Sequence, residues 1–236
     1  MAVTKAGTKR ICLYMKATSL SLFYANFGTN LEYMIEKGAV LPLFYLPPVE
    51  YFTELNNYNP DFLVERHEHF PKQTYRNRAN IYSPDGLLTL VVPVVKGSKV
   101  HTPVKDVKIS YDFNWQRLHW MSLQGCYRRS AYFEYYEDDL AIFFEAKEMF
   151  LFDLNEKLLR MLLNLLKIKA TINYTEGYEP EYPAMKDLRQ SISSKKASPF
   201  PQKPYYQLFE ERHGFMRNLS VVDLLFNQGP QSVNYL

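Results

Sequence analysis

The sequence predicts an α/β fold in which a mixed sheet is flanked by helices within a single domain; an α+β arrangement is the alternative. Two observations indicate this class. Strand-like runs fill the first half and include an antiparallel hairpin around the turn Ser83–Gly86. Segments with helical periodicity dominate from Asn114 onward. A chain of 236 residues can form one large domain or two small ones.

Short apolar runs bounded by turn residues predict the strands. Val40–Leu46 is apolar and is followed by two prolines, which favours a buried strand ended by a breaker. The hairpin is predicted because proline at the second and glycine at the fourth position of Ser83–Gly86 favour a type I turn. Strands are predicted at 40–46, 62–64, 79–82, 87–95, 106–110 and 169–174.

Apolar residues at helical spacing behind polar capping residues predict the helices. Proline is favoured in the first turn of a helix, so Pro48 can open one that stops at Asn56–Pro60. The other predicted helices cover 115–127, about 132–145, 153–166 and 221–227. Their predicted N-terminal caps are Asn114, Ser130, Asp153 with Glu156, and Ser220 with Asp223.

Composition narrows the function classes. The 47% hydrophobic and 22% charged residues are those of an ordinary soluble globular protein. The net charge of +3 is dispersed, so general nucleic-acid binding is not expected. Cys12 and Cys126 show neither metal-ligand spacing nor a disulfide framework, which favours a reducing cytoplasm. No apolar stretch is long enough to span a membrane.

The first 38 residues lack clear periodicity and a sustained signal-peptide core. They are predicted to be an N-terminal extension outside the core domain, or the product of a wrongly assigned start codon, with Met34 the better start. The core domain is then residues 39–236.

The segment Glu65–Arg78 concentrates polar chemistry. It holds two His, three Arg, and one each of Lys, Gln, Asn and Tyr. On a strand, His67 and His69 would point to the same face, and Glu65 could join them. A metal site needs a third and usually a fourth ligand, so no metal site is predicted. An imidazole can instead serve as a general base.

A row of cations follows in the same segment. The guanidinium groups of Arg76 and Arg78, together with Lys72, suit a phosphate or carboxylate. The amides of Gln73 and Asn77 suit sugar hydroxyls or a base edge. The segment therefore predicts a site for an anionic small molecule such as a nucleotide-sugar, and a solvated charged face is the alternative.

The second half offers weaker candidates. His119 lies one helical turn from Trp115, and Cys126 lies further along the same predicted helix. A buried, unreactive Cys126 is favoured over a nucleophile, because nothing around it matches a known nucleophile setting. Ser191–Pro204 is interpreted as a solvated loop rather than a basic flap over an anionic ligand. No phosphate-binding, dinucleotide-binding, zinc-protease or hydrolase motif is present.

Several stretches together resemble the WbqC-like protein family of bacteria. They are LPPVEYF (46–52), HE followed by KQTYRNR (67–78), LTLVVPV (88–94), Trp115 with His119, Tyr132-Phe133 and NLSVVDLLFNQGP (218–230). The resemblance covers residue 40 to the end in this order. The sequence departs from the family pattern at His69, Phe70 and Pro71, which weakens any metal role for His69.

The resemblance implies a function in surface polysaccharide biosynthesis, since such proteins are associated with O-antigen gene clusters. It suggests a transferase that moves an acyl or aminoacyl group onto an amino sugar or nucleotide-sugar, and it specifies no cofactor. The alternative is a non-enzymatic ligand-binding or scaffold protein. The candidate catalytic residues are His67 and His119. The candidate substrate-binding residues are Lys72, Gln73, Tyr75, Arg76, Asn77, Arg78 and Tyr132.

Overall fold

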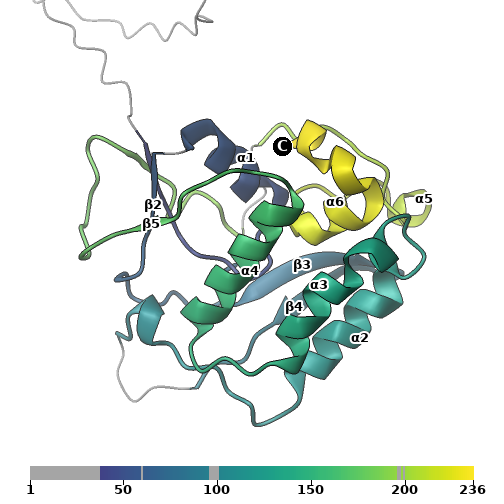
Figure 1. Cartoon of the computed structure of the whole chain (residues 1–236), viewed down its shortest axis with the longest axis horizontal. Helices are drawn as coiled ribbons and strands as arrows, with labels where there is room; N and C mark the ends of the chain where they lie inside the picture. Colours follow the sequence, from purple (N-terminus) through teal and green to yellow (C-terminus); the bar gives the residue numbers. More distant parts are fainter. Residues whose placement is uncertain (1–37, 60, 96–100, 196–197, 199) are drawn as a thin grey trace, which may run out of the picture. The chain divides into compact units, whose positions relative to one another are not determined.

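The computed structural model describes residues 38–59, 61–95, 101–195, 198 and 200–236. It confirms the α/β class, with parallel and antiparallel strands and helices around them (Figure 1). The described residues hold six α-helices: α1 (Val49–Tyr58), α2 (Trp115–Tyr127), α3 (Phe133–Glu145), α4 (Leu151–Leu165), α5 (Glu210–His213) and α6 (Val221–Gln228). Two 3-10 helices, η1 (Val104–Asp106) and η2 (Gly229–Tyr235), complete the helical elements.

A four-stranded parallel sheet runs in the order β5-β2-β1-β6. Its strands are β1 (Ala39–Leu41), β2 (Phe62–Val64), β5 (Asn173–Tyr174) and β6 (Lys186–Asp187). Neighbouring parallel strands need a crossover connection, and α1 provides it between β1 and β2. All three residues of β1 are buried, as expected for the central strand of a parallel sheet.

The predicted hairpin is confirmed as an antiparallel pair, β3 (Arg78–Ser83) and β4 (Gly86–Val91). Gly86 adopts a φ of 101°, which a residue with a side chain rarely adopts. Glycine at this position therefore fixes the register in which Ser83 pairs with Gly86.

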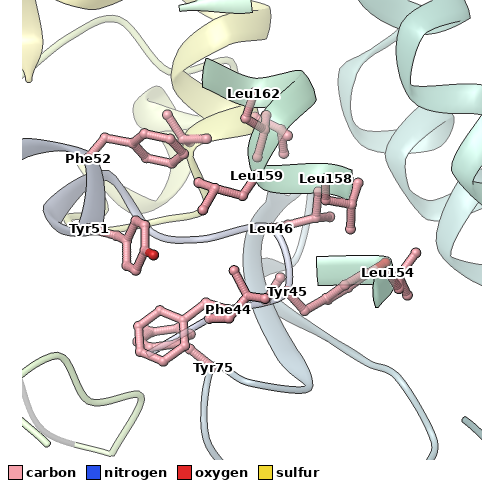
Figure 2. Close-up of a cluster of buried hydrophobic side chains, with 14 of the residues drawn as sticks. Phe44, Tyr45, Leu46, Tyr51, Phe52, Tyr75, Leu154, Leu158, Leu159 and Leu162 are labelled. Carbon is pink, nitrogen blue, oxygen red and sulfur yellow. The ribbon is translucent and has the colours of Figure 1, made fainter. Parts of the chain in front are cut away.

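The apolar stripe of α4 enters the core, as its helical spacing predicts. Leu154, Leu158 and Leu162 are buried against aromatic side chains that follow β1 and line α1 (Figure 2). The ring of Phe44 contacts those of Tyr51 and Tyr75, with centroids 5.4 and 5.6 Å apart. Much of the tyrosine content thus serves the core.

Some local predictions were wrong, and long-range contacts explain the differences. The strand predicted at 40–46 is observed as β1, which ends at Leu41. Residues 42–46 are buried but form no regular secondary structure. The strand predicted at 106–110 is replaced by η1 and isolated bridges, and the strand predicted at 169–174 shrinks to β5. Asn114 caps α2 as predicted, accepting from the Arg117 amide at 3.2 Å. The other predicted side-chain caps make no capping bond, and α4 begins before its predicted capping box.

The predicted N-terminal extension lies outside the described residues but for Gly38. Part of the predicted connection at 191–204 also lies outside them. Within the described part of the chain, no helix is both long enough and apolar enough to cross a membrane.

Candidate functional site

Polar side chains gather at the carboxyl ends of the parallel strands. Glu65 directly follows β2, Thr175 follows β5, and Arg189 lies two residues after β6. In open parallel sheets, ligands bind outside the carboxyl ends of the strands, where neighbouring connections leave in opposite directions. From β1 the chain continues to β2 and β5 on one side of the sheet, whereas β6 lies on the other side of β1, so such a point lies between β1 and β6. This edge is therefore the natural place to look for a site.

Glu65 is fully buried and anchors this edge. Its Oε1 accepts hydrogen bonds from the backbone amides of His67 at 2.6 Å and Glu68 at 3.2 Å. It also accepts from the Thr175 hydroxyl at 3.0 Å. The Oε2 atom lies 3.6 Å from Nη1 of Arg189. One carboxylate thus joins β2, β5 and the residues after β6.

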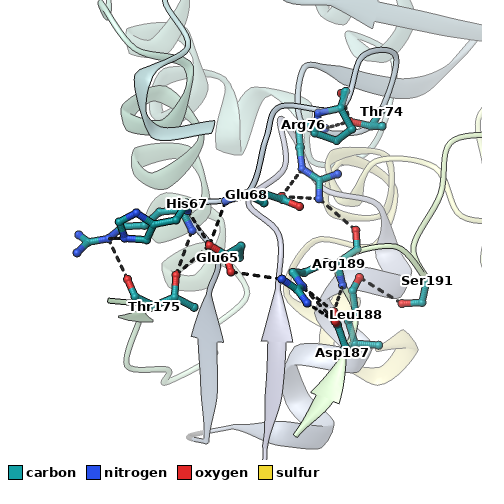
Figure 3. A network of polar contacts seen from close by, with 12 residues as sticks. Glu65, His67, Glu68, Thr74, Arg76, Thr175, Asp187, Leu188, Arg189 and Ser191 are labelled. Carbon is teal, nitrogen blue, oxygen red and sulfur yellow. Dashed lines mark hydrogen bonds and ion pairs between the residues drawn. The ribbon is translucent and has the colours of Figure 1, made fainter. Parts of the chain in front are cut away.

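A chain of ion pairs continues from Glu65 (Figure 3). Arg76 is 3% exposed, and its Nε donates to Oε1 of Glu68 at 2.6 Å. The Arg76 Nη2 atom also donates to the Arg189 carbonyl at 3.1 Å. Arg189 pairs with Asp187 through Nε at 2.9 Å and Nη2 at 2.5 Å. We call Glu65, Glu68, Arg76, Asp187 and Arg189 the ionic floor.

Charge in the ionic floor is unbalanced, since three carboxylates face two guanidinium groups. Burial raises the pKa of Glu68, while Arg76 opposes that rise. Hydrogen bonds from Arg189 lower the pKa of Asp187. The Oε2 atom of Glu68 receives no hydrogen bond from any described residue, because both Arg76 contacts use Oε1. The ionic floor therefore favours a cationic or hydrogen-bond-donating ligand over an anion.

Rings at the surface border the ionic floor. The Arg189 guanidinium lies 5.4 Å from the ring centroid of Tyr178 and 5.0 Å from that of Tyr182. Tyr178 is about half exposed, and its ring lies 6.5 Å from that of His69. His69 in turn lies 4.8 Å from His101. We call His69, His101 and Tyr178 the ring rim.

A small cavity lies on another side of Arg76. Its walls are mostly apolar, and Asn155 is its second polar residue. The Nδ2 atom of Asn155 donates to the Arg76 carbonyl at 2.7 Å, while its Oδ1 is buried without a partner among the described residues. The cavity is close to the smallest that can hold one water molecule. It is too small to be the main ligand site.

Comparison with known proteins identifies the family of the chain. A sequence model of the WbqC-like protein family matches residues 44–198, which include the whole ionic floor.

The chain belongs to the WbqC-like protein family.

A curated relative, "Uncharacterized protein Rv1507c" from Mycobacterium tuberculosis, is 25% identical over 228 residues. The alignment covers 86% of this chain and 98% of that protein. No solved structure matches the chain at a significant level.

In this WbqC-like protein, two sequence-predicted residues lie at the ionic floor. Arg76 is part of it, and half-buried His67 borders it through its backbone bond to Glu65. The Nε2 atom of His67 accepts a hydrogen bond from Nε of Arg66 at 3.1 Å. Tyr75 is buried beside Phe44 rather than open to a ligand. Lys72 and Gln73, which lie between Glu68 and Arg76 in the sequence, have exposed side chains.

Three other predicted residues are buried or half-buried. Asn77 is buried and its Nδ2 donates to the Val92 carbonyl at 3.0 Å. Arg78 starts β3 half-buried, with its Nε lacking a described partner. Tyr132 packs against the backbone of Gly229, where an added Cβ would lie 2.4 Å from its ring. None of these three has a described bond to the ionic floor.

His119 lies apart from His67, in a pocket of aromatic residues. Its Nδ1 is 2.9 Å from the Tyr45 hydroxyl, and a backbone hydrogen bond joins the ring to Val91. The Trp115 ring lies 5.1 Å away. Burial lowers the pKa of His119 to about 4, so the imidazole is neutral at physiological pH. The described contacts of His119 and His67 share no residue.

Cys126 is buried, as the unreactive interpretation of the sequence expects. Burial, followed by the charge of Asp223, raises the pKa of the Cys126 thiol to about 11, which opposes nucleophile formation. Among the described residues, no group of three or more His, Cys, Asp or Glu side chains is arranged to hold a metal ion.

Sequence reasoning missed Glu68, Asp187 and Arg189. Glu68 stands inside the polar segment, and its position just beyond β2 could have identified it. Asp187 and Arg189 belong to β6 and the chain after it, and a two-residue strand gives no periodic signal.

Proposed function

We propose that this WbqC-like protein is a transferase acting on an amino sugar, free or nucleotide-linked, in surface polysaccharide biosynthesis. The observation that carries the proposal is the carboxylate excess of the ionic floor, with Oε2 of Glu68 free of described donors. An ammonium group donates three hydrogen bonds and complements such a floor. The exposed Tyr178 ring offers a sugar ring an apolar face.

The proposed reaction joins the sugar amine to an activated acyl or aminoacyl ester. The amine nitrogen attacks the ester carbonyl carbon, a C–N bond forms, and the C–O bond breaks with its electron pair leaving on the alkoxide oxygen. His67, whose backbone is fixed by Glu65, is the proposed base: once its Nε2 releases the hydrogen bond from Arg66, it takes the proton that the bound ammonium loses before attack. The second proton lost from nitrogen passes to the leaving alkoxide oxygen. Lys72 and Gln73, both exposed, are proposed to contact the phosphates of a nucleotide-linked sugar.

Calorimetric titration with glucosamine and N-acetylglucosamine tests the amine preference. We expect the free amine to bind and the acetylated sugar, which lacks the charge, to bind at least about tenfold more weakly. Glu68→Gln should remove the preference, whereas Glu211→Gln, at an exposed position in α5, should keep it. Because Glu68→Gln also loosens Arg76, Tyr178→Leu at the surface provides a second test that spares the buried pairs. Equal binding of the two sugars, or of neither, would contradict the proposal.

A non-enzymatic ligand-binding or scaffold role is the second candidate. It is favoured by the internal pairing of Arg76 and Asn77 and by the enclosed position of His119. Mass spectrometry separates the two roles. The protein is incubated with glucosamine and one of two probe donors: acetyl-coenzyme A, a thioester, or glycine methyl ester, an ester. An acylated sugar whose formation requires His67 supports the transferase. Amine-specific binding without any product supports the binding protein.

A further inference from the structure

The helices α2 and α3 expose large apolar side chains away from the core. Leu118 is 55% exposed and Met121 53% on α2, while Tyr135 is 73% and Ile142 57% exposed on α3. Residues three or seven positions apart lie on similar faces of a helix. The two helices pack against each other, and Figure 1 shows them side by side at one edge of the fold. We call these exposed faces the α2–α3 surface.

Charge on the α2–α3 surface is strongly divided between the helices. The chain from α2 to Arg129 carries Arg117, Arg128 and Arg129 and no carboxylate, and all three are exposed. In contrast, α3 contains no Lys or Arg and carries five carboxylates: Glu134, Glu137, Asp138, Asp139 and Glu145. No ion pair within the described residues uses any of these eight charges.

We infer that the α2–α3 surface binds a second copy of this chain. A two-fold axis would place basic α2 of each copy against acidic α3 of the other, so each complementary contact forms twice. The apolar residues between the charges would then be removed from water on both copies. Gly125 lies four positions after Met121 and seven after Leu118 on α2, and a side chain added there would meet no atom within 4 Å, so this face of α2 is open.

A second copy fits this surface better than an unrelated partner because the surface is complementary to itself. An acidic partner would leave the carboxylates of α3 facing like charge, and a basic partner would do the same to the arginines of α2. Only a partner that presents both signs in the mirrored order satisfies both helices, and the chain itself presents that pattern. The inference does not depend on the proposed transferase activity.

Analytical ultracentrifugation of the full chain over a wide concentration range tests the inference. We expect a reversible dimer that weakens at high salt, because exposed ion pairs are screened. The charge reversal Arg128→Glu with Arg129→Glu should raise the dimer dissociation constant roughly tenfold or more. These positions are exposed and have no described partner, so folding should persist.

A compensating variant makes the test specific. Adding Asp138→Lys and Asp139→Lys to the arginine reversals restores opposite charge across the proposed interface, so dimerisation should recover. Lys147→Glu, an exposed charge reversal just beyond α3, serves as the matched control and should leave dimerisation unchanged. A monomer at every concentration would overturn the inference. So would a dimer indifferent to the arginine reversals, since it would use another face.

Discussion

His119 offers a quantitative test of the structure because its imidazole is held neutral inside the protein. Burial lowers its pKa from 6.5 to about 4. The Tyr45 hydroxyl and the Val91 backbone both form hydrogen bonds with the ring. Since a carbonyl only accepts, the ring donates to Val91 and accepts the Tyr45 proton at Nδ1. Protonation would add a buried charge and remove the acceptor for Tyr45.

The direction in which the free energy of unfolding changes with pH follows from proton binding in the folded and unfolded states. Between pH 4 and 6.5 the unfolded chain binds a proton at His119 that the folded chain does not. The free energy of unfolding is therefore complete above pH 6.5 and falls as the pH drops toward 4. A difference of 2.5 pKa units (6.5 − 4), at about 1.4 kcal/mol each, amounts to about 3 kcal/mol.

Urea unfolding of the wild type and His119→Gln at several pH values measures this contribution. Glutamine has a donor and an acceptor but does not titrate. We expect the free energy of unfolding of the variant, relative to the wild type, to rise by about 3 kcal/mol from neutral pH to pH 4. A difference that stays constant across this range would refute the reasoning.

Asp223→Asn provides a control in which the pH dependence of stability is expected to run in the opposite direction. This carboxylate is fully buried and accepts from the hydroxyls of Tyr127 at 2.8 Å and Tyr205 at 2.7 Å. Burial raises its pKa from 3.8 to about 6. The folded state therefore binds the extra proton, and this stability is present below pH 3.8 and lost as the pH rises through 6. Relative to the wild type, Asp223→Asn should lose stability toward acid, where His119→Gln gains it.

Three further variants test the scaffold by thermal or urea unfolding. Leu158→Ala in the core should lower the free energy of unfolding by about 2–5 kcal/mol, and a smaller loss than about 1 kcal/mol would argue against its burial. Asn114→Ala should cost about 1 kcal/mol by removing the cap of α2, whereas Asn114→Asp should keep it. Gly229→Ala should be strongly destabilising, because φ is 54° and the added Cβ would meet the Tyr132 ring. Tyr132→Ala should recover part of that loss, and additive effects of the two changes would contradict this contact.

The elements that the sequence predicted well are those specified by neighbouring residues. The hairpin depends on the turn Ser83–Gly86, and α2 on its cap Asn114, so both are encoded locally. The parallel sheet is different, because β6 and β5 have two residues each and gain their partners from distant chain. The predicted strand at 106–110 failed for the same reason, since isolated bridges took the place of a ladder.

The candidate site was only partly predictable because residue types do not reveal pairing. The cations at Lys72, Arg76 and Arg78 predicted an anion site, yet the buried Arg76 gives its hydrogen bonds to Glu68 and to a backbone carbonyl. The ion pair of Arg189 with Glu65 joins the chain after β6 to the chain after β2, so it could be identified only once the sheet order was established. A polar segment thus predicted where to look, but the tertiary contacts determine which sign of charge is left for a ligand.

That remaining charge constrains the orientation of a nucleotide-linked amino sugar. Removing a partner from a buried ion pair is costly, so a phosphate cannot readily displace Glu68 from Arg76. A phosphate at the ionic floor would also face the carboxylates of Glu65 and Asp187. The phosphates are then better placed at exposed Lys72, outside the floor, with the amine directed at Glu68. Within the proposed function, Lys72→Ala should therefore weaken the nucleotide-linked sugar while leaving binding of the free amino sugar unchanged.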